Sequence, residues 1–144
     1  MEIPHGFGPV RYFCSMHPMT QAVSQLYKKW SGHEPDSIDL LPESGSDRRY
    51  FRLHGQGKSV IGTYGENIRE NEAFLYFTEH FNKKGLPVPQ FLAVAEDKRA
   101  YLQSDLGDTS LLSVLEKEGE TPTVYALFQQ TVQSLARLQV KADA

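Results

Sequence analysis

The stretch SIDLLPESGSDRRYFRLHGQGKSVIGTY (residues 37–64) contains three short runs rich in β-branched and aromatic residues. These runs are SIDLL, RRYFRL and SVIGTY, and they are separated by SGSD and HGQGK, which hold the small and polar residues of tight turns. Short β-rich runs joined by such turns predict an antiparallel meander of three strands.

A helix and two further strands are expected after the meander. Asn67, with Glu70 three residues later, resembles a capping box, and Gly85 is a typical helix stop. Two more β-rich runs, FLAVAE (91–96) and AYLQS (100–104), come next. The apolar stripe of this helix consists of Ala73, Phe74, Phe77 and Phe81. Five antiparallel strands with one helix inserted after the third predict the α+β class.

Before the meander, the sequence predicts one helix behind a flexible extension. Residues 1–18 show neither helical nor strand periodicity. Cys14 and His17 have a C-x-x-H spacing, but no second pair completes four metal ligands, so a metal site is disfavoured. Thr20 is a plausible N-cap, and Gly32 would end the helix. The apolar face of this helix consists of Val23, Leu26, Tyr27 and Trp30.

Helices are also expected at the C-terminal end. Asp108 or Thr109 would cap the first of them, and Gly119 would stop it. Thr121 followed by Pro122 is a typical cap and first helical residue of the last one. Its apolar residues at helical spacing are Val124, Leu127, Phe128, Val132, Leu135 and Leu138.

Composition narrows the function classes. The chain has 144 residues, a formal charge of −3 and 40% hydrophobic residues, which fits an ordinary globular domain or part of a larger one. No apolar run approaches the roughly 20 residues needed to cross a bilayer, so no membrane partner is expected. The single cysteine fits a reducing, cytoplasmic location.

Two functional interpretations of the meander are disfavoured. Residues 57–59 (GKS) match the end of a Walker A loop, but Arg52 stands where that motif needs its first glycine, and a strand rather than a helix follows. We therefore interpret HGQGK as a hairpin turn. A nucleic-acid surface would need Arg48, Tyr50 and Arg52 on one strand face to be joined by a second basic and aromatic strand, and none is present.

A third interpretation is a nucleotide clamp, since a Gly/Ser turn between antiparallel strands can lay backbone N–H groups over phosphates. The order of motifs along the chain supports it. ESGSDRRYFRL (43–53) and SVIGTY (59–64) look like a phosphate-covering loop with the second and third strands of a kinase-like lobe. NIRENEAFLYFTEHF (67–81) looks like the helix that supplies an orienting glutamate. The G-x-P-V-P segment that leads into the fourth strand is matched by GLPVPQFLAVAED (85–97). The fifth strand, the hinge and the next helix are matched by YLQSDLGDTSLLSVL (101–115).

This ordered set resembles the N-terminal lobe of the aminoglycoside phosphotransferase and choline kinase-like family, relatives of protein kinases. Among its members, the chain looks most like bacterial kinases that phosphorylate cell-wall amino sugars. The resemblance implies a kinase-like lobe over 19–103, a hinge and helix over 104–120, and the first long helix of a truncated large lobe over 121–144. It implies ATP and Mg²⁺ as cofactors and a sugar or amino sugar hydroxyl as acceptor. The nucleotide-binding residues it implies are Gly45, Ser46, Asp47, Arg48, Arg49, Glu70, Gln103, Ser104 and Leu106.

The orienting glutamate has two candidates. Glu70 shares a helix face with Ala73, Phe74 and Phe77, so it is expected to point toward the sheet, whereas Glu72 is expected to face solvent. We therefore favour Glu70.

The chain departs from the family pattern in two ways. Protein kinases carry a lysine on the third strand that pairs with the helix glutamate, but Gly62 or Thr63 stands there, so Arg48, Arg49 or Arg52 would carry the phosphate charge. The sequence also lacks an H-x-D-x-x-x-x-N segment, which supplies the base and metal ligands, and we interpret Asp105 and Asp108 as cap or turn residues.

The sequence therefore predicts a nucleotide-binding lobe that does not catalyse phosphoryl transfer by itself. The alternative is a non-catalytic module whose exposed apolar cleft and last helix bind a partner, either a separately encoded large lobe or a second copy.

Overall fold

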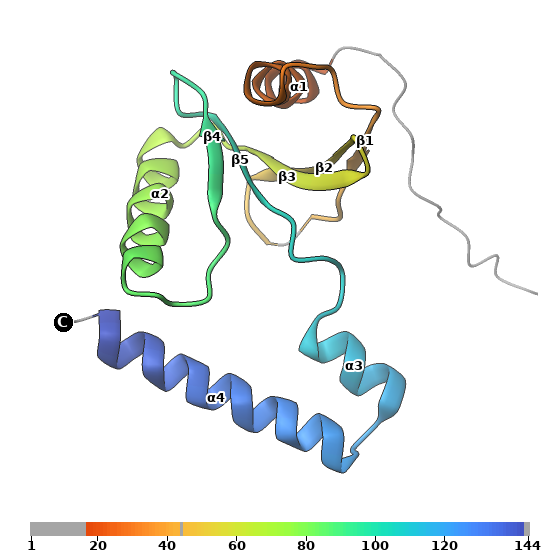
Figure 1. Ribbon diagram of the computed structural model, residues 1–144, viewed down its shortest axis with the longest axis vertical. Coiled ribbons are helices and arrows are strands. Elements are labelled where there is room, and N and C mark those ends of the chain that lie inside the picture. The colour runs from red at the N-terminus through yellow and green to blue at the C-terminus, as the bar shows by residue number, and fades with distance from the viewer. Residues whose placement is uncertain (1–16, 44, 143–144) are drawn as a thin grey trace, which may run out of the picture. The chain divides into compact units, whose positions relative to one another are not determined.

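The computed structural model describes residues 17–43 and 45–142, and the chain within them is an α+β protein with a five-stranded antiparallel sheet (Figure 1). The chain divides into two compact units. One comprises the residues up to Phe77 together with Pro89–Asp105, and the other comprises Thr78–Val88 together with the residues from Leu106 onward. In chain order, the elements are α1 (Pro18–Ser31), β1 (Ser37–Leu40), β2 (Arg49–Gly55), β3 (Lys58–Tyr64), α2 (Ile68–Lys83), β4 (Phe91–Val94), β5 (Ala100–Ser104), α3 (Leu111–Glu118) and α4 (Pro122–Ala142).

The predicted meander is confirmed as β1, β2 and β3, and β5 and β4 complete the sheet in the order β1-β2-β3-β5-β4. β2 and β3 are joined by a two-residue turn in which Gln56 has φ 52° and Gly57 has φ 73°. Positive φ at both positions is the geometry of the type I′ turn that fits the twist of paired strands. Lys58 therefore pairs with Gly55 at the tip of a hairpin, and the interpretation against a Walker A loop is confirmed.

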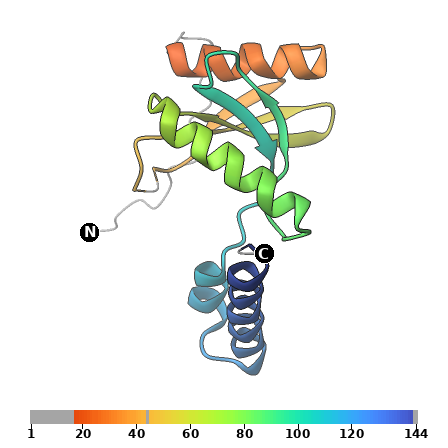
Figure 2. The same ribbon diagram turned by 90° about the vertical axis from the view of Figure 1, so that its left-hand side faces the viewer.

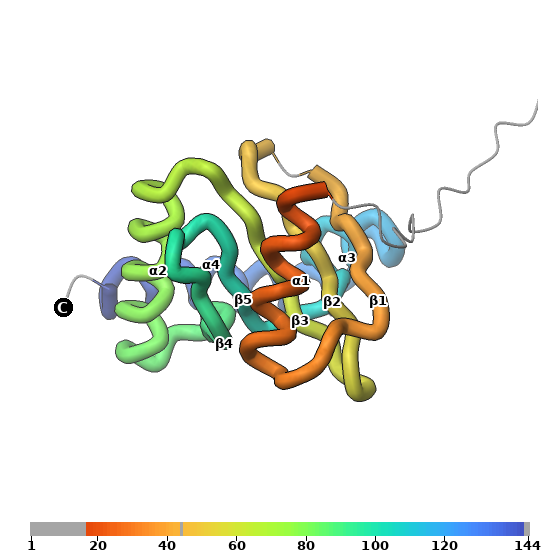
Figure 3. The backbone as a smooth tube through the Cα atoms, turned by 90° about the horizontal axis from the view of Figure 1, so that it is seen from above, coloured from red at the N-terminus to blue at the C-terminus, as the bar shows by residue number. Residues whose placement is uncertain are grey.

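One face of the sheet packs against α1. Phe51 and Leu53 of β2 and Leu102 of β5 lie on this face, and they form one core cluster with Val23 and other apolar residues of α1. The helix overlies the strands in Figures 2 and 3. Gly62 lets it approach closely, because a Cβ at this position would lie 2.6 Å from Leu53 Cδ1 and 3.1 Å from Val23 Cβ.

α1 begins earlier than the sequence suggested. Its N-cap is His17 and Pro18 occupies the first turn, so the expectation of a cap at Thr20 is wrong. Proline needs no hydrogen-bonded N–H in the first turn and has the φ of a helix, which is why the helix extends back to it. The stop at Gly32 is confirmed, with φ 85°. Cys14 lies outside the described residues, and no group of metal ligands occurs within them.

The opposite face of the sheet receives the N-terminal half of α2. The ring of Phe74 lies 5.7 Å from that of Tyr101 and 5.9 Å from that of Phe91, measured between centroids. The predicted cap is confirmed, since the Glu70 N–H donates to Asn67 Oδ1 at 3.2 Å. The predicted apolar stripe is wrong in part, because Phe77 is 53% exposed and Ala73 is exposed.

A buried amide explains this rotation of α2. Asn71 is fully buried, and its Nδ2 donates to the carbonyl oxygens of Gly65 and Lys98 at 2.8 and 2.9 Å. These bonds tie the first turn of the helix to the turn after β3 and to the turn between β4 and β5. The buried side of the helix therefore follows Asn71 and Phe74, and the residues one position before or after them are turned outward.

In the second unit, α3 packs against α4. Ser110 caps α3 through a capping box with Ser113, so the expectation of Asp108 or Thr109 as the cap is wrong. The stop at Gly119 is confirmed, and so is the start of α4 at Thr121–Pro122. Within the described part of the chain, no helix is long and apolar enough to span a membrane.

Candidate functional site

The first part of the candidate site is an ion pair that joins the sheet to α2. Arg48 lies directly before β2, and its Nη2 is 2.9 Å from Glu70 Oε1 in the first turn of α2. The same nitrogen donates to the Glu70 backbone oxygen at 3.1 Å. The Arg48 side chain is only 12% exposed, whereas that of Glu70 is 52% exposed. The cation is thus fixed beneath the start of the helix, and one side of the carboxylate faces outward.

Aromatic side chains surround the arginine. The Arg48 guanidinium lies 5.1 Å from the centroid of the Phe74 ring, within the range of a cation–π interaction. The Tyr101 ring also packs against Phe74 and is fully buried. Burial raises the pKa of Tyr101 to about 12, although the charge of Arg48 acts in the opposite direction. The phenol is therefore a neutral hydrogen-bond donor at all physiological pH values.

Several buried donors around Arg48 have no strong partner among the described residues. Thr63 and Tyr101 are opposite each other on β3 and β5, and both are fully buried. Within the described residues, no partner is found for Ser46 Oγ or Arg48 Nε, and the Thr63 and Tyr101 hydroxyls have at most a weak hydrogen bond to each other. Buried polar groups are almost always satisfied by protein, water or ligand. Each of these four groups can donate a hydrogen bond, so together they suit an oxyanion or ordered water.

The second part of the site lies further along the same strand face. Arg52 of β2 forms two parallel bonds to Asp105, from Nε to Oδ2 at 2.7 Å and from Nη2 to Oδ1 at 3.1 Å. Ser59 of β3 donates to the same Oδ2 at 2.7 Å. Arg48 and Arg52 are separated by four residues of extended chain, or about 13 Å. The two clusters thus lie at different points along one strand face, one at the start of β2 and the other near its middle.

Asp105 has a different role from the one expected. Its side chain is 8% exposed and holds two donors, so its interpretation as a cap or turn residue is wrong. Arg52 and Ser59 lie on adjacent strands, and their side chains converge just beyond the end of β5. The carboxylate therefore fastens the segment after β5 to the middle of the sheet.

The turn residues, Arg48 and Glu70 are brought to one end of this face. Gly45 has φ 66°, which favours glycine, and Ser46 and Asp47 continue the turn up to Arg48.

Arg49 points the other way. It lies on the sheet face that packs against α1, and its Nη1 pairs with Glu43 at 2.5 Å. The alternation that sends Arg48, Tyr50 and Arg52 to one face and Arg49 to the other is confirmed. Arg49 cannot reach a ligand bound beside Arg48 from this position.

The predicted residues at the end of β5 have mixed surroundings. Gln103 lies on the same face as Tyr101, and its Oε1 is buried without a partner among the described residues. The Ser104 N–H already donates to the Gln90 backbone oxygen at 2.9 Å, and its Oγ accepts from the Gln90 N–H at 3.0 Å. Leu106 belongs to the second unit, and it is 73% exposed.

A lysine at Gly62 or Thr63, the positions matched to the third-strand lysine of protein kinases, could not reach the helix glutamate. Gly62 faces α1, where even a Cβ is obstructed. Thr63 faces the Arg48 cluster, but it is fully buried against Tyr101. Arg48 therefore reaches the helix glutamate from the neighbouring strand. Glu72 makes an exposed ion pair with Lys98, so the choice of Glu70 as the glutamate that contacts a buried cation is supported.

Tyr101 and Thr63 were missed as site residues in the sequence. They stand in the β-rich runs AYLQS and SVIGTY, where a tyrosine or threonine is ordinary strand composition. The available signal was strand alternation, because it puts Thr63 and Tyr50 on the same face as Arg48.

The sequence matches no protein-family model, and it is not significantly similar to any curated protein. The resemblance to aminoglycoside phosphotransferases thus depends on the order of motifs, and the chemistry of the site must be argued from its own residues.

Proposed function

We propose that this chain is the nucleotide-binding lobe of a small-molecule phosphotransferase that uses ATP with Mg²⁺. The acceptor is a hydroxyl of a sugar or amino sugar, as the family resemblance implies. The observation that carries the proposal is the Arg48–Glu70 pair. In protein kinases, a strand lysine paired with a helix glutamate contacts the nucleotide phosphates. Here a buried arginine next to β2 makes the equivalent link to the helix after β3.

The donors present support the proposal that this site binds phosphate. The Arg48 Nε and the Ser46 hydroxyl lie at the turn that precedes β2, and neither has a partner among the described residues. A charged hydrogen bond to a phosphate oxygen contributes about 1.5–3 kcal/mol, so these groups favour an anion over water. Glu70 keeps the guanidinium in place, and its exposed side is available to a cation-bound phosphate.

Adenine would lie at the Gln103 end of the same face. Gln103 Oε1 is a buried acceptor without a partner among the described residues, and the Arg52–Asp105 pair holds the segment that follows it. The two clusters are separated along β2, as the base and the terminal phosphates are separated within a nucleotide. Because the sequence has no H-x-D-x-x-x-x-N segment, we propose that the base and the Mg²⁺ ligands come from a second lobe.

The test is a calorimetric titration of the chain with ATP and Mg²⁺. Arg48→Gln should weaken the affinity by about tenfold or more, because one charged hydrogen bond is lost. Arg49→Gln is the matched control, since it removes the same charge from the opposite face, and it should change the affinity by less than about twofold. Equal affinity of the wild type and Arg48→Gln, with both proteins folded, would refute the proposal.

A second candidate function is binding of a partner protein. The observation that favours it is an exposed apolar stripe on α4, where Tyr125, Phe128, Val132 and Leu135 are 40–67% exposed. Patches of this kind in soluble proteins often mark interaction sites. Light scattering across a concentration series would reveal self-association, and Val132→Glu should abolish it. A monomer at all concentrations, with or without the substitution, would argue against self-association.

A further inference from the structure

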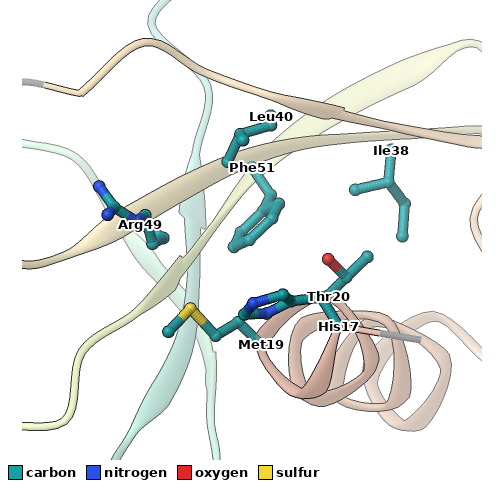
Figure 4. A pocket seen from close by; sticks show the side chains of 7 residues that line it. All are labelled: His17, Met19, Thr20, Ile38, Leu40, Arg49 and Phe51. Atoms are coloured by element: carbon teal, nitrogen blue, oxygen red, sulfur yellow. The ribbon is translucent and has the colours of Figure 1, made fainter. Parts of the chain in front are cut away.

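A pocket lies on the face of the sheet opposite to Arg48. It is formed between the first turn of α1, the edge strand β1 and its neighbour β2, with a volume of about 300 Å³. This volume is at the lower end of the range of small-molecule sites. The side chains that line it are His17, Met19, Thr20, Ile38, Leu40, Arg49 and Phe51 (Figure 4).

The walls of the pocket are mostly apolar. Ile38, Leu40 and Phe51 form one side and Met19 faces them from α1, as Figure 4 shows. Arg49 stands at one end of the pocket, and Ile38 stands toward the other. A ligand that fills this space must therefore have an apolar body, with any negative charge at the Arg49 end.

Among the described residues, the counter-ion of the cation at that end is an exposed carboxylate. The Arg49 side chain is 34% exposed, and its partner Glu43 is 71% exposed. Ion pairs with a solvated partner contribute little, because water competes for both charges. An anionic ligand that enters the pocket can therefore replace Glu43 at Arg49 at small cost.

The start of α1 adds to the positive potential of the pocket. His17 caps the helix without a side-chain hydrogen bond, and the first turn contains no acidic residue. The N–H groups of Met19 and Thr20 belong to the first turn, where helix donors have no intrahelical acceptor. The helix dipole also favours negative charge at this end. Met19 and Thr20 themselves line the pocket, so it lies beside the first turn of the helix.

We infer that this pocket binds a small organic monocarboxylate with an apolar body of about ten non-hydrogen atoms. Arg49 binds the carboxylate, Phe51 and Leu40 contact the body, and the start of α1 supplies additional positive potential. This site is separate from the proposed nucleotide site, because Arg49 and Arg48 lie on opposite faces of the sheet. Either proposal can therefore fail without the other.

The test uses 3-phenylpropionate as a probe, and 3-phenylpropionamide as its neutral analogue, in titrations of the ¹⁵N-labelled full chain followed by NMR. The acid should produce saturable shifts of the Met19, Thr20, Leu40 and Phe51 amides. 3-Phenylpropionamide should bind at least about tenfold more weakly than the acid, because it cannot form the charged pair with Arg49.

Two variants test the role of charge. Arg49→Gln should lower the affinity for 3-phenylpropionate by about tenfold. Glu43→Gln should raise this affinity severalfold, because the competing carboxylate is gone. Arg99→Gln, an exposed arginine elsewhere on the same unit, is the matched control and should leave the affinity unchanged. Because Glu43 is exposed, Glu43→Gln is expected to fold. The role of charge can therefore be tested with this variant even if Arg49→Gln does not fold.

Three outcomes would overturn the inference. The first is equal binding of the acid and the amide, and the second is the absence of saturable shifts at the pocket residues. The third is binding that occurs only after residues 1–16 have been removed, which would make those residues of the same chain the occupant of the pocket.

Discussion

Arg52 and Asp105 form a two-bond ion pair across 53 positions of sequence, with distances of 2.7 and 3.1 Å and with side chains that are 14% and 8% exposed. The pair fixes the segment after β5 against the middle of β2. Its parallel geometry is the strongest that an arginine and a carboxylate can adopt. A buried charge is costly without its partner, so the two residues are expected to depend on each other.

Asp105→Ala should therefore lower the free energy of unfolding by about 3–5 kcal/mol, since it removes the carboxylate that compensates the Arg52 charge. Urea denaturation followed by circular dichroism measures the change. The double variant Arg52→Met/Asp105→Leu should be less destabilised than Asp105→Ala alone, because no uncompensated charge is buried. A double variant that is as unstable as the sum of the single variants would show that the two residues act independently.

Tyr101 should make the stability depend on pH in the alkaline range. A tyrosine in the unfolded chain has a pKa of about 10, whereas burial raises the pKa of Tyr101 to about 12 in the folded protein. The folded state thus keeps the phenol proton over this range while the unfolded state loses it, so stability falls as pH rises from about 10 to about 12. Tyr101→Phe should flatten this part of the profile in denaturation measured at several pH values. An unchanged slope would mean that another group causes the loss.

The same substitution separates stability from nucleotide binding. The Tyr101 hydroxyl is buried with at most a weak hydrogen bond to Thr63 among the described residues, so its removal should leave the free energy of unfolding at pH 7 unchanged or raise it by about 1 kcal/mol. If the hydroxyl donates to a bound phosphate, Tyr101→Phe should nevertheless lower the affinity for ATP by about threefold to tenfold. Calorimetry on the folded variant is the measurement. Unchanged ATP affinity would remove Tyr101 from the proposed site.

Gly62→Ala should be destabilising by about 1–3 kcal/mol, because the added methyl group overfills the contact between β3 and α1. Its Cβ would lie 2.6 Å from Leu53 Cδ1 and 3.1 Å from Val23 Cβ. Leu53→Ala should partly rescue Gly62→Ala, since it removes Cδ1, the atom that the added methyl group would meet first. Thermal melts of the two single variants and the double variant test this, and the absence of any coupling would contradict the close approach.

Much of the fold could be predicted because its signals are local. The HGQGK turn, the Gly32 and Gly119 stops and the Thr121–Pro122 start depend on a few adjacent residues. The errors at the helix starts arose where two local signals competed. Proline at position 18 extended α1 past the cap expected at Thr20, and a serine pair capped α3 two residues from the expected aspartate.

The site was harder to predict because it is assembled over long sequence separations. Arg48 and Glu70 could be proposed together, since a turn and a helix start each have recognisable signals. The contact between Asp105 and Arg52 has no such signal, because it depends on β5 pairing with β3 and β3 with β2. The pocket beside Arg49 also requires the position of α1 on the sheet, which no periodicity specifies.

The two-residue turn at Gln56 and Gly57 has a consequence for the order of folding. It brings seven residue pairs of β2 and β3 together with almost no loop to close, so the entropy lost on forming this hairpin is small. The pairing of β5 with β3 closes a much longer loop, because α2 and β4 lie between these two strands in the sequence. We expect the hairpin to be structured in the folding transition state and β5 to dock late. Substitutions in β2 and β3 should then slow folding, whereas those in β5 should mainly speed unfolding.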